Sequence, residues 1–306
     1  MKIAIIGRSE SLYLVTKHLI ECGFEIVVIV TAKEAPEYNI KSEDFKSLAV
    51  AHNISFVHTA KIETAFHFIH DTGANIGISI NYPGIIPLKV TDLFKHGILN
   101  VHGGDLPMYR GNACQAWALL NSESKIGLCV HKMIGGELDN GDIIARDYIS
   151  VSKDTKINQV LDWMALRTPE LVVNALKKII DDPDYILEVQ SNDPSKALRC
   201  YPRRPEDGRI CWSKSATDIL LLINASNRPY AGAFCQYEKE KIVIWDAEEV
   251  EDSERFCAVP GQVTKIGDGF LEVACGTGKL RVLSIEKNDQ IMKPNAMIRS
   301  IRKRLS

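Results

Sequence analysis

The sequence lacks a run of about 20 apolar residues, the length that a membrane-spanning helix needs. The opening apolar run meets Arg8 and Glu10 too early for a secretory leader. The eight cysteines form no CxxC pair and no cluster with the spacing of zinc ligands. Scattered cysteines in a chain of this length are typical of reduced thiols. We therefore expect a cytoplasmic protein without a membrane span and without a metal.

The sequence also lacks a large excess of charge of one sign, since its formal net charge is −2. A protein that grips nucleic acid needs several clustered Lys or Arg side chains to neutralise phosphates. We therefore do not expect nucleic acid as a partner. The basic run at residues 299–304 is more typical of a solvated helix end than of a nucleic-acid site.

The glycine pattern of a dinucleotide site is missing. The opening segment IAIIGRSES has Gly7 but not the second and third glycines of GxGxxG. Nicotinamide or flavin binding is therefore not supported. Gly7 is best explained by a tight turn from strand to helix, and Ser9 remains a candidate for a polar contact with a ligand.

The first two thirds of the chain alternate apolar β-type runs with segments of helical periodicity, which predicts an α/β fold with a mostly parallel, Rossmann-like sheet. We expect the carboxyl ends of its strands to form the ligand-binding edge. The predicted strands are residues 2–6, 25–30, 54–58, 75–80, 97–101 and 126–133, and the predicted helices are residues 11–22, 44–52, 64–71, 113–121 and 157–180.

The last third has a different composition. Residues 181–207 carry four prolines and many polar residues, which is typical of a linker, and residues 216–226 have helical periodicity. Short strands separated by glycines follow, which predicts a smaller β-rich, open-barrel (OB-like) domain. With 306 residues, we expect domains at 1–200 and 228–306, joined by a linker and helix at 201–227.

The segment from Asn100 to Asp142 carries the chemistry. Asn100 and His102 are two residues apart at the end of a predicted strand, so both side chains point into the same cleft. Asp139 lies in LDNGD, which is a common turn sequence but also places a carboxylate where it can orient an imidazole. An amide, an imidazole and a carboxylate together indicate acyl transfer. The spacing alone leaves a structural role for His102 open.

These segments, in this order, resemble the folate-dependent formyltransferase family over nearly the whole chain. The motifs that carry the resemblance are NYPGIIP (81–87), NVHGGDLPMYRG (100–111), GLCVHKMIGGELDNGDII (127–144), YPRRPEDGRICW (201–212) and the β-rich tail. The second and third match the family's Asn-x-His, Leu-Pro-x-Tyr-Arg-Gly and Leu-Asp-x-Gly-Asp-Ile patterns. The fourth resembles the linker of methionyl-tRNA formyltransferases and of the 4-amino-arabinose formyltransferase domain.

The resemblance implies an enzyme that moves a formyl group from 10-formyltetrahydrofolate to a primary amine. It implies that Asn100, His102 and Asp139 are catalytic, and it leaves open whether His102 acts as a base or as an oxyanion stabiliser. The implied cofactor-binding residues are Tyr82, Ile85, Ile86, Pro87, Gly136, Leu138 and Asp142. The candidate substrate-binding residues are Arg8, Ser9, Gly103, Tyr109, Arg110 and Arg204, of which the three arginines are candidates to bind a nucleotide diphosphate. A homodimer is a further expectation.

The acceptor is harder to predict. The segment AKEAPEYNIKSEDFK (32–46) stands where methionyl-tRNA formyltransferases carry a basic insertion, and here it is not basic. Gly104-Asp105 and Asn112-Ala113-Cys114 also depart from the tRNA enzymes. We therefore expect a nucleotide-linked amino (dideoxy) sugar as acceptor, for surface or flagellar glycan biosynthesis. Methionyl-tRNA is the alternative, and a non-catalytic folate- or nucleotide-binding protein is a second one.

Overall fold

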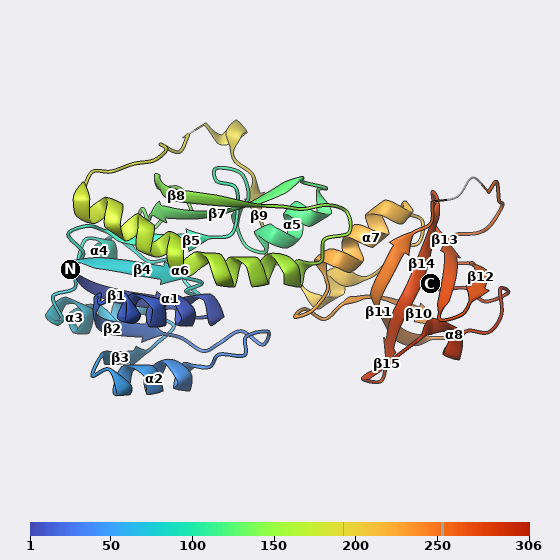
Figure 1. The fold of residues 1–306 in the computed structure, drawn as a ribbon, viewed down its shortest axis with the longest axis horizontal. Coiled ribbons are helices and arrows are strands. Elements are labelled where there is room, and N and C mark those ends of the chain that lie inside the picture. Colours follow the sequence, from blue (N-terminus) through green and yellow to red (C-terminus); the bar gives the residue numbers. More distant parts are fainter. Residues whose placement is uncertain (192, 252–253) are drawn as a thin grey trace. The chain divides into compact units, whose positions relative to one another are not determined.

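The computed structural model describes residues 1–191, 193–251 and 254–306 (Figure 1). The chain divides into two compact units. Unit 1 comprises Met1–Cys114, Ile126–Ile149 and Leu161–Tyr201, and unit 2 comprises Gln115–Lys125, Ser150–Val160 and Pro202–Ser306. The domain boundaries at residues 200 and 227 remain a prediction. Residue 192, which falls in the predicted linker, lies outside the described residues.

Unit 1 is built on a seven-stranded sheet of order β3-β2-β1-β4-β5-β7-β8. The pairs β3-β2, β2-β1, β1-β4 and β4-β5 are parallel, whereas β7 runs antiparallel to β5. The mostly parallel sheet predicted from the sequence is confirmed. The strands are β1 (Lys2–Gly7), β2 (Glu25–Thr31), β3 (Ser55–His58), β4 (Ile76–Ile80), β5 (Ile98–His102), β7 (Lys125–Lys132) and β8 (Ile143–Ser150).

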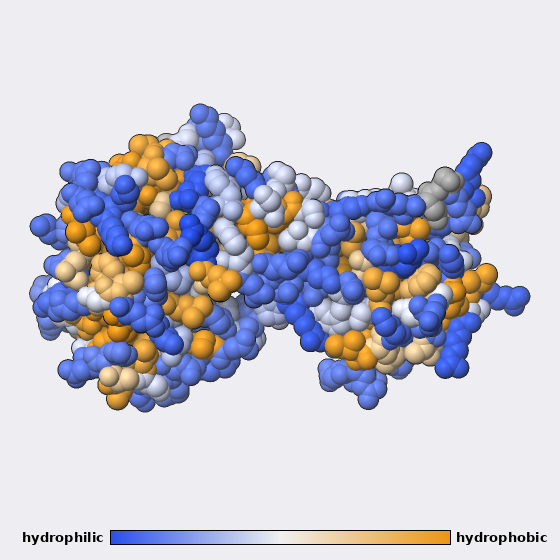
Figure 2. Space-filling view, viewed as in Figure 1, coloured by the Kyte–Doolittle hydropathy of each residue, from blue (hydrophilic) through white to orange (hydrophobic). Residues whose placement is uncertain are grey.

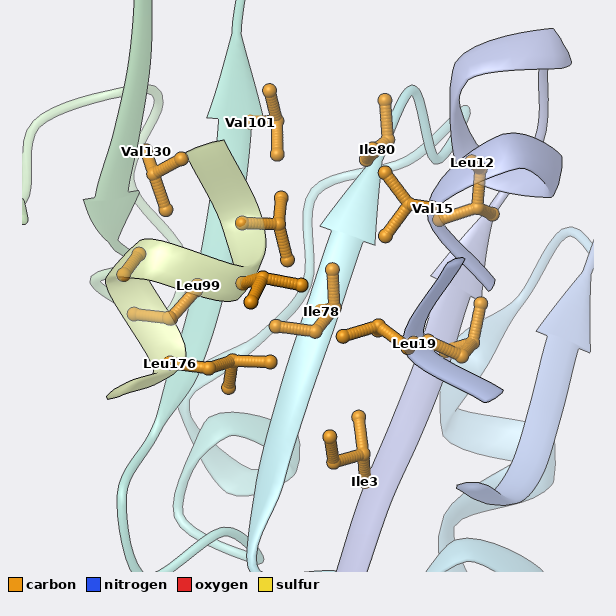
Figure 3. Close-up of a cluster of buried hydrophobic side chains, with 14 of the residues drawn as sticks. Ile3, Leu12, Val15, Leu19, Ile78, Ile80, Leu99, Val101, Val130 and Leu176 are labelled. Atoms are coloured by element: carbon orange, nitrogen blue, oxygen red, sulfur yellow. The ribbon is translucent and has the colours of Figure 1, made fainter. Parts of the chain in front are cut away.

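Helices cover this sheet because their apolar residues recur at helical spacing. Figure 3 shows Leu12, Val15 and Leu19 of α1 against strand side chains such as Ile78, and Leu176 of α6 close to Leu99. Each such buried side chain contributes roughly 1.5–3 kcal/mol. The helices of unit 1 are α1 (Glu10–Glu21), α2 (Ser42–Ala51), η1 (Ile62–Ala65), α3 (Phe66–Asp71), α4 (Leu88–Thr91), η2 (Pro194–Lys196) and most of α6 (Ile157–Asp181), whereas α5 (Cys114–Leu120) belongs to unit 2 from its second residue on.

The parallel strands place Gly7, Ile80 and His102 at the same edge of the sheet. Gly7 has a φ of 134°, and a Cβ there would overlap the carbonyl of Ile80. Glycine is therefore required at the first turn for close packing of β1 against β4, which agrees with the tight turn expected from the sequence.

A second, two-stranded parallel sheet forms where the sequence predicts a linker. β6 (Arg110–Gly111) pairs with β9 (Arg199–Cys200). The backbone N–H of Arg110 donates to the carbonyl of Leu198 at 2.8 Å, and that of Asn112 donates to Cys200 at 3.1 Å. The reading of residues 181–207 as a linker throughout is therefore wrong. Two of its prolines, Pro194 and Pro205, are the first residues of short 3-10 helices, and the segment pairs with β6 of unit 1 through β9.

Unit 2 contains an antiparallel sheet of order β10-β11-β14-β13-β12, with β15 paired to β14. Its core is formed by the apolar side of α7 and by alternate residues of the strands, among them Ile219, Ile244 and Val273. The β-rich C-terminal fold predicted from the sequence is confirmed. The elements are η3 (Pro205–Gly208), α7 (Ala216–Ala225), β10 (Ala233–Tyr237), β11 (Glu240–Glu249), β12 (Val263–Gly267), β13 (Phe270–Ala274), β14 (Lys279–Lys287), β15 (Gln290–Met292) and α8 (Pro294–Met297).

The last residues of the chain lie between the two edge strands of this sheet. Ser306 exchanges two backbone hydrogen bonds with Gln236 of β10, at 2.6 and 2.9 Å. On the other side, Val263 of β12 donates to Lys303, and Leu305 donates to Gly261. The basic run at 299–304 is therefore not a helix end, as the sequence suggested, because its backbone closes the open sheet.

The surface of unit 1 carries both apolar and hydrophilic areas. On the face in Figure 2, its apolar patches are separated by hydrophilic residues. No helix in the described part of the chain has both the length and the apolar content to cross a bilayer.

Candidate active site

Asn100, His102 and Asp139 meet at the carboxyl end of β5. Asn100 and His102 are on β5 itself, and Asp139 follows β7 in a turn, where its φ is 49°. His102 Nδ1 lies 3.4 Å from Asp139 Oδ2, and Asn100 Nδ2 donates to Asp139 Oδ1 at 3.4 Å. The side chains of His102 and Asp139 are only 9% and 10% exposed. The structure thus brings together the three residues that the sequence predicts to be catalytic.

The second ring nitrogen of His102 is held by the backbone. Nε2 lies 2.6 Å from the carbonyl oxygen of Tyr109. A carbonyl can only accept, so Nε2 carries the proton in this contact. Gly104 makes room for it, because a Cβ at that position would lie 2.6 Å from Nε2 and would overlap the Tyr109 carbonyl. Tyr109, at a φ of 56°, therefore contributes through its main chain.

His131 is a fourth member of the cluster, and sequence reasoning missed it. It lies opposite Asn100 in the β5–β7 pairing and is 1% exposed. Its Nε2 lies 3.1 Å from Asn100 Nδ2 and 3.5 Å from Asp139 Oδ1. Only the antiparallel register of β7 against β5 places it there. Asn100 sits between an imidazole and a carboxylate, which fixes the orientation of its amide.

Asp139 is ionised at neutral pH. Burial raises the pKa of a carboxyl group, but His102, His131 and the N–H of Gly111 outweigh it and hold the pKa of Asp139 well below its usual value. The Gly111 N–H donates to Oδ2 at 2.9 Å.

Gln190 ties the Asp139 turn to Arg110, and nothing in the sequence marked it. Its side-chain amide donates to the carbonyls of Asp139 and Gly141 at 3.1 and 2.5 Å. Its Oε1 accepts from Arg110 Nη2 at 2.8 Å. Gln190 is 4% exposed. It lies in the segment predicted as a linker, where polar residues carry no periodic signal.

The predicted cofactor-binding loops lie side by side. The backbone N–H of Gly136 donates to the carbonyl of Ile86 at 2.8 Å, and a Cβ at Gly135 would overlap the backbone of Leu88. Three large apolar side chains are exposed on these loops, namely Ile85, Leu88 and Ile134. Tyr82 and Pro87 are half-buried, and the Tyr82 hydroxyl donates to the Thr59 carbonyl at 3.0 Å.

Asp142, also predicted to bind the cofactor, is engaged within the protein. Its Oδ1 accepts from the backbone N–H of Gln190 at 3.1 Å, and its carbonyl accepts from Lys132. These contacts close the turn that presents Asp139. In this structure Asp142 therefore positions Asp139.

Four of the predicted substrate-binding residues lie in different surroundings. Arg8 spans two loops, donating to the carbonyls of Lys33 and Asn81. Ser9 is buried, and its hydroxyl has no hydrogen-bond partner among the described residues. Gly103 is buried beside His102 on the chain. Arg204 belongs to unit 2, where its backbone N–H donates to Asp207 at 2.7 Å.

Arg110 lines a cleft of about 500 Å³ next to Asp139. The residues on either side of Asp139 form one wall, and the segment around β9 forms the other. The lining residues are Arg110, Glu137, Leu138, Asn140, Asp193, Pro194, Ala197 and Arg199.

The cysteines near the site are not poised for nucleophilic attack. Burial raises the pKa of the Cys114 thiol far above its usual value, and it raises the pKa of Cys129 to about 11. Thiols with raised pKa values stay protonated and are poor nucleophiles. In the described parts of the chain, no three His, Cys, Asp or Glu side chains are grouped so as to hold a metal ion.

Curated relatives match the chain over most of its length. A methionyl-tRNA formyltransferase from Acetivibrio thermocellus is 29% identical over 291 residues, covering 94% of this chain and 92% of the relative. One from Pelotomaculum thermopropionicum is 28% identical over 293 residues, covering 94% and 91%.

Solved structures share the fold at low identity. The N-formyltransferase from Helicobacter canadensis, in complex with folinic acid and dTDP-3-aminofucose, superimposes with a TM-score of 0.70 at 15% identity, covering 92% of this chain and 99% of that one. HypX from Aquifex aeolicus, in complex with tetrahydrofolic acid, gives a TM-score of 0.63 at 15% identity, covering 97% and 46%.

Two family models divide the chain between them. The model for formyl transferase matches residues 1–176, and the model for the formyl transferase C-terminal domain matches residues 203–302. The first match contains β5, β7 and all three side chains of the buried cluster. The chain is therefore a member of the formyl transferase family.

Proposed function

We propose that this protein transfers a formyl group from 10-formyltetrahydrofolate to a primary amine. The observation that carries the proposal is the buried cluster of Asn100, His102 and Asp139, in which an amide, an imidazole and an ionised carboxylate lie within 3.4 Å of their neighbours. Such a cluster stabilises the negative charge that builds on a carbonyl oxygen under attack by an amine.

Asn100 and His102 supply the hydrogen-bond donors. The amide nitrogen of Asn100 lies 3.4 Å from Asp139 Oδ1 and 3.1 Å from His131 Nε2, so Asn100 must release one of these contacts to donate to a developing oxyanion. His102 Nε2 carries a proton in its contact with Tyr109, which favours a donor role over a base role at the start of the reaction. The Asp139 carboxylate, 3.4 Å from His102 Nδ1, orients the imidazole.

The loops around Ile86 and Gly136 fit a reduced folate. Ile85, Leu88 and Ile134 are 61%, 58% and 41% exposed. Their side chains form an apolar surface that suits a flat heterocycle. The backbone bond from Gly136 to Ile86 holds the two loops together. When bound, 10-formyltetrahydrofolate would supply the formyl group. Folate complexes of fold relatives support this assignment.

Two substitutions test the catalytic proposal. We expect Asn100→Ala and His102→Ala to lower the rate of formyl transfer by roughly a hundredfold or more each. Asn174→Ala and His52→Ala, at exposed positions of the same unit, serve as matched controls and should leave the rate unchanged. Near-normal rates for Asn100→Ala and His102→Ala would refute the proposed roles. Folate binding without transfer to any amine would favour a binding protein.

For the acceptor, the comparisons favour methionyl-tRNA over the nucleotide-linked amino sugar that the sequence analysis preferred. The curated relatives that match 94% of the chain bear the name methionyl-tRNA formyltransferase. The family C-terminal domain at residues 203–302 is also present. We therefore take the amino group of methionyl-tRNA as the first candidate.

A nucleotide-linked amino sugar is the second candidate because of the loop after β2. This loop carries both positive and negative side chains. Arg8 contacts it from the β1–α1 turn, donating to the Lys33 carbonyl and lying over the Tyr38 ring. A fold relative has been solved with a dTDP-amino sugar. Assays of the same preparation with methionyl-tRNA and with dTDP-amino sugars would separate the two. Transfer to one acceptor with a kcat/KM at least a hundredfold higher would decide between them.

Two further expectations are kept as proposals. All eight cysteines are free in the structure, which agrees with a reducing compartment, and we propose a cytoplasmic location. We also propose a homodimer, on the resemblance alone. Sedimentation of the purified protein tests it, since a single species of 34.1 kDa would exclude a stable dimer.

A further inference from the structure

Arg110 and Arg199 form a cross-strand pair at the mouth of the cleft beside Asp139. They are direct partners in the parallel pairing of β6 with β9, so their side chains start from the same face of that sheet. Like charges directly opposite each other destabilise a sheet. Two arginines in this arrangement therefore do not stabilise the sheet. An anion bound between them would offset their repulsion.

Arg110 is fixed in place and still has an unused donor. Its Nη2 donates to Gln190 Oε1 at 2.8 Å, which orients the guanidinium. Its Nε is buried and has no hydrogen-bond partner among the described residues. Burial lowers the pKa of Arg110 and outweighs the charges of Asp139 and Glu137, which raise it. An added negative charge would compensate for this loss of solvation.

Arg199 is exposed and forms no ion pair within the described part of the chain. Its guanidinium lies over the ring of Tyr201, 5.4 Å from the centroid, and its Nε and Cδ lie close to Gly111. The two acidic residues of the cleft accept hydrogen bonds from neutral groups close to them in the sequence. Glu137 accepts from Asn140 at 2.5 Å, and Asp193 accepts from Ser195 at 2.9 Å. The N–H donors of Arg199 are thus free to face a ligand.

We propose that Arg110 and Arg199 form a subsite for a phosphate or diphosphate group of the acceptor. Guanidinium groups bind phosphate oxygens through paired hydrogen bonds, and two of them match a diphosphate. The cleft of about 500 Å³ adjoins Asp139 through Leu138 and Asn140, so a phosphate bound there lies near the reacting amine. The identity of the ligand rests on the proposed function. The anion subsite itself does not.

The proposed subsite predicts that substitution of Arg199 weakens binding of the acceptor and not of the folate. Replacing Arg199 by Ala should raise the KM for the acceptor at least tenfold and leave both kcat and the KM for the folate unchanged, because the formyl donor uses the loops at Ile86 and Gly136. Arg199→Lys keeps the charge but loses the paired geometry, so it should recover part of the affinity. Lys177→Ala removes one exposed positive charge from α6 of the same unit and is the matched control.

The decisive experiment measures binding of inorganic pyrophosphate to the full chain by calorimetry, without any turnover. We expect saturable binding that weakens at least tenfold in Arg199→Ala, weakens less in Arg199→Lys and is unchanged in Lys177→Ala. Thermal unfolding of each variant checks that the fold is kept. Absence of pyrophosphate binding to the native protein, or equal binding to Arg199→Ala, would overturn the subsite.

Kinetic measurements then identify the source of the phosphate. Pyrophosphate should compete with the acceptor and not with the folate. A rise in the KM for the folate alone, larger for folates with more glutamates, would assign the arginines to the folate tail and overturn the proposal. Pyrophosphate binding in a protein that transfers a formyl group to no primary amine would leave the subsite standing and defeat the proposed function.

Discussion

The backbone N–H of Gly111 donates a 2.9 Å hydrogen bond to Oδ2 of Asp139. Gly111 belongs to β6, which pairs with β9, and the catalytic candidate Asp139 lies in the turn after β7. The two-stranded sheet therefore holds the carboxylate at Oδ2, whereas His131 Nε2 lies 3.5 Å from Oδ1. The site depends on backbone pairing as much as on the side chains of the cluster.

Gly111→Ala should disrupt this bond. Gly111 has a φ of 103°, and a Cβ there would overlap the carbonyl of Cys200, so β6 and β9 would have to separate. We expect a loss of kcat of at least tenfold and a loss of stability of about 1–3 kcal/mol. Gly23→Ala, at a φ of 80° with nothing within 4 Å, is the control for backbone strain alone. Equal effects on kcat from both variants would contradict the prediction.

Gly104→Ala should release His102 from Tyr109. The new Cβ would lie 2.6 Å from Nε2 and take the space of the hydrogen bond. Gly104 has no left-handed φ, so the effect is steric. We expect kcat to fall at least tenfold, and the nitrogen chemical shifts of the imidazole to report loss of the Nε2–H contact. An unchanged His102 signal in the variant would show that the Tyr109 carbonyl does not fix the ring.

The charge of Asp139 predicts how stability depends on pH. Its pKa in the folded protein lies below the usual 3.8, so its ionised form stabilises the fold above that pH. This contribution is lost as the pH falls through the folded-state pKa. The difference in unfolding free energy between native protein and Asp139→Asn should therefore be constant from neutral pH to about pH 5 and shrink below about pH 4. Urea unfolding across this range measures it, and a difference that grows at low pH would have the wrong sign.

His131→Phe should change the pH dependence of stability that Asp139 confers. His131 is one of the groups that lower the pKa of Asp139, and phenylalanine keeps its approximate volume without its nitrogens. We expect the pKa of Asp139 to move back toward its usual value and kcat to fall, since Asn100 loses a neighbour 3.1 Å away. Carboxyl titration by NMR checks the direction. An unchanged Asp139 titration would exclude His131 from the cluster's electrostatics.

Leu305→Ala should destabilise unit 2. Leu305 is 2% exposed, and its backbone donates to Gly261 where the chain end closes the sheet. Loss of a buried leucine costs about 2–5 kcal/mol. Ile301→Ala, at a 52% exposed position four residues earlier, is the matched control and should change stability by less than about 0.5 kcal/mol. Similar melting temperatures for both variants would contradict the closure.

The sequence was sufficient for elements whose pattern is local. The strands at Glu25–Thr31 and Ile76–Ile80 each lie within one residue of the predicted ranges 25–30 and 75–80, because short runs of apolar β-branched residues mark them. Asn100 and His102 were predicted to share a face because a strand alternates. In these cases the information lies within a few residues of the chain.

Features that depend on pairing between distant segments were not predictable in this way. His131 joins the cluster through the antiparallel register of β7 against β5, and Gln190 joins it from 48 residues beyond Asp142. β6 and β9 have two residues each, too few for any periodicity. The pairing of Arg110 with Arg199 follows from the same hidden contact. Long-range register, unlike helix or strand type, is set by tertiary packing.

The pairing of β6 with β9 limits how far the chain can be truncated from its C-terminus without loss of contacts in the site. The family model for the N-terminal part ends at residue 176, whereas Gln190 and β9 come later in the chain. A fragment ending at 176 would retain Asn100, His102 and Asp139 but lose both the amide that holds the Asp139 turn and the strand that aligns Gly111. A fragment that keeps these contacts must extend at least through Cys200, beyond the end of the match to the family model.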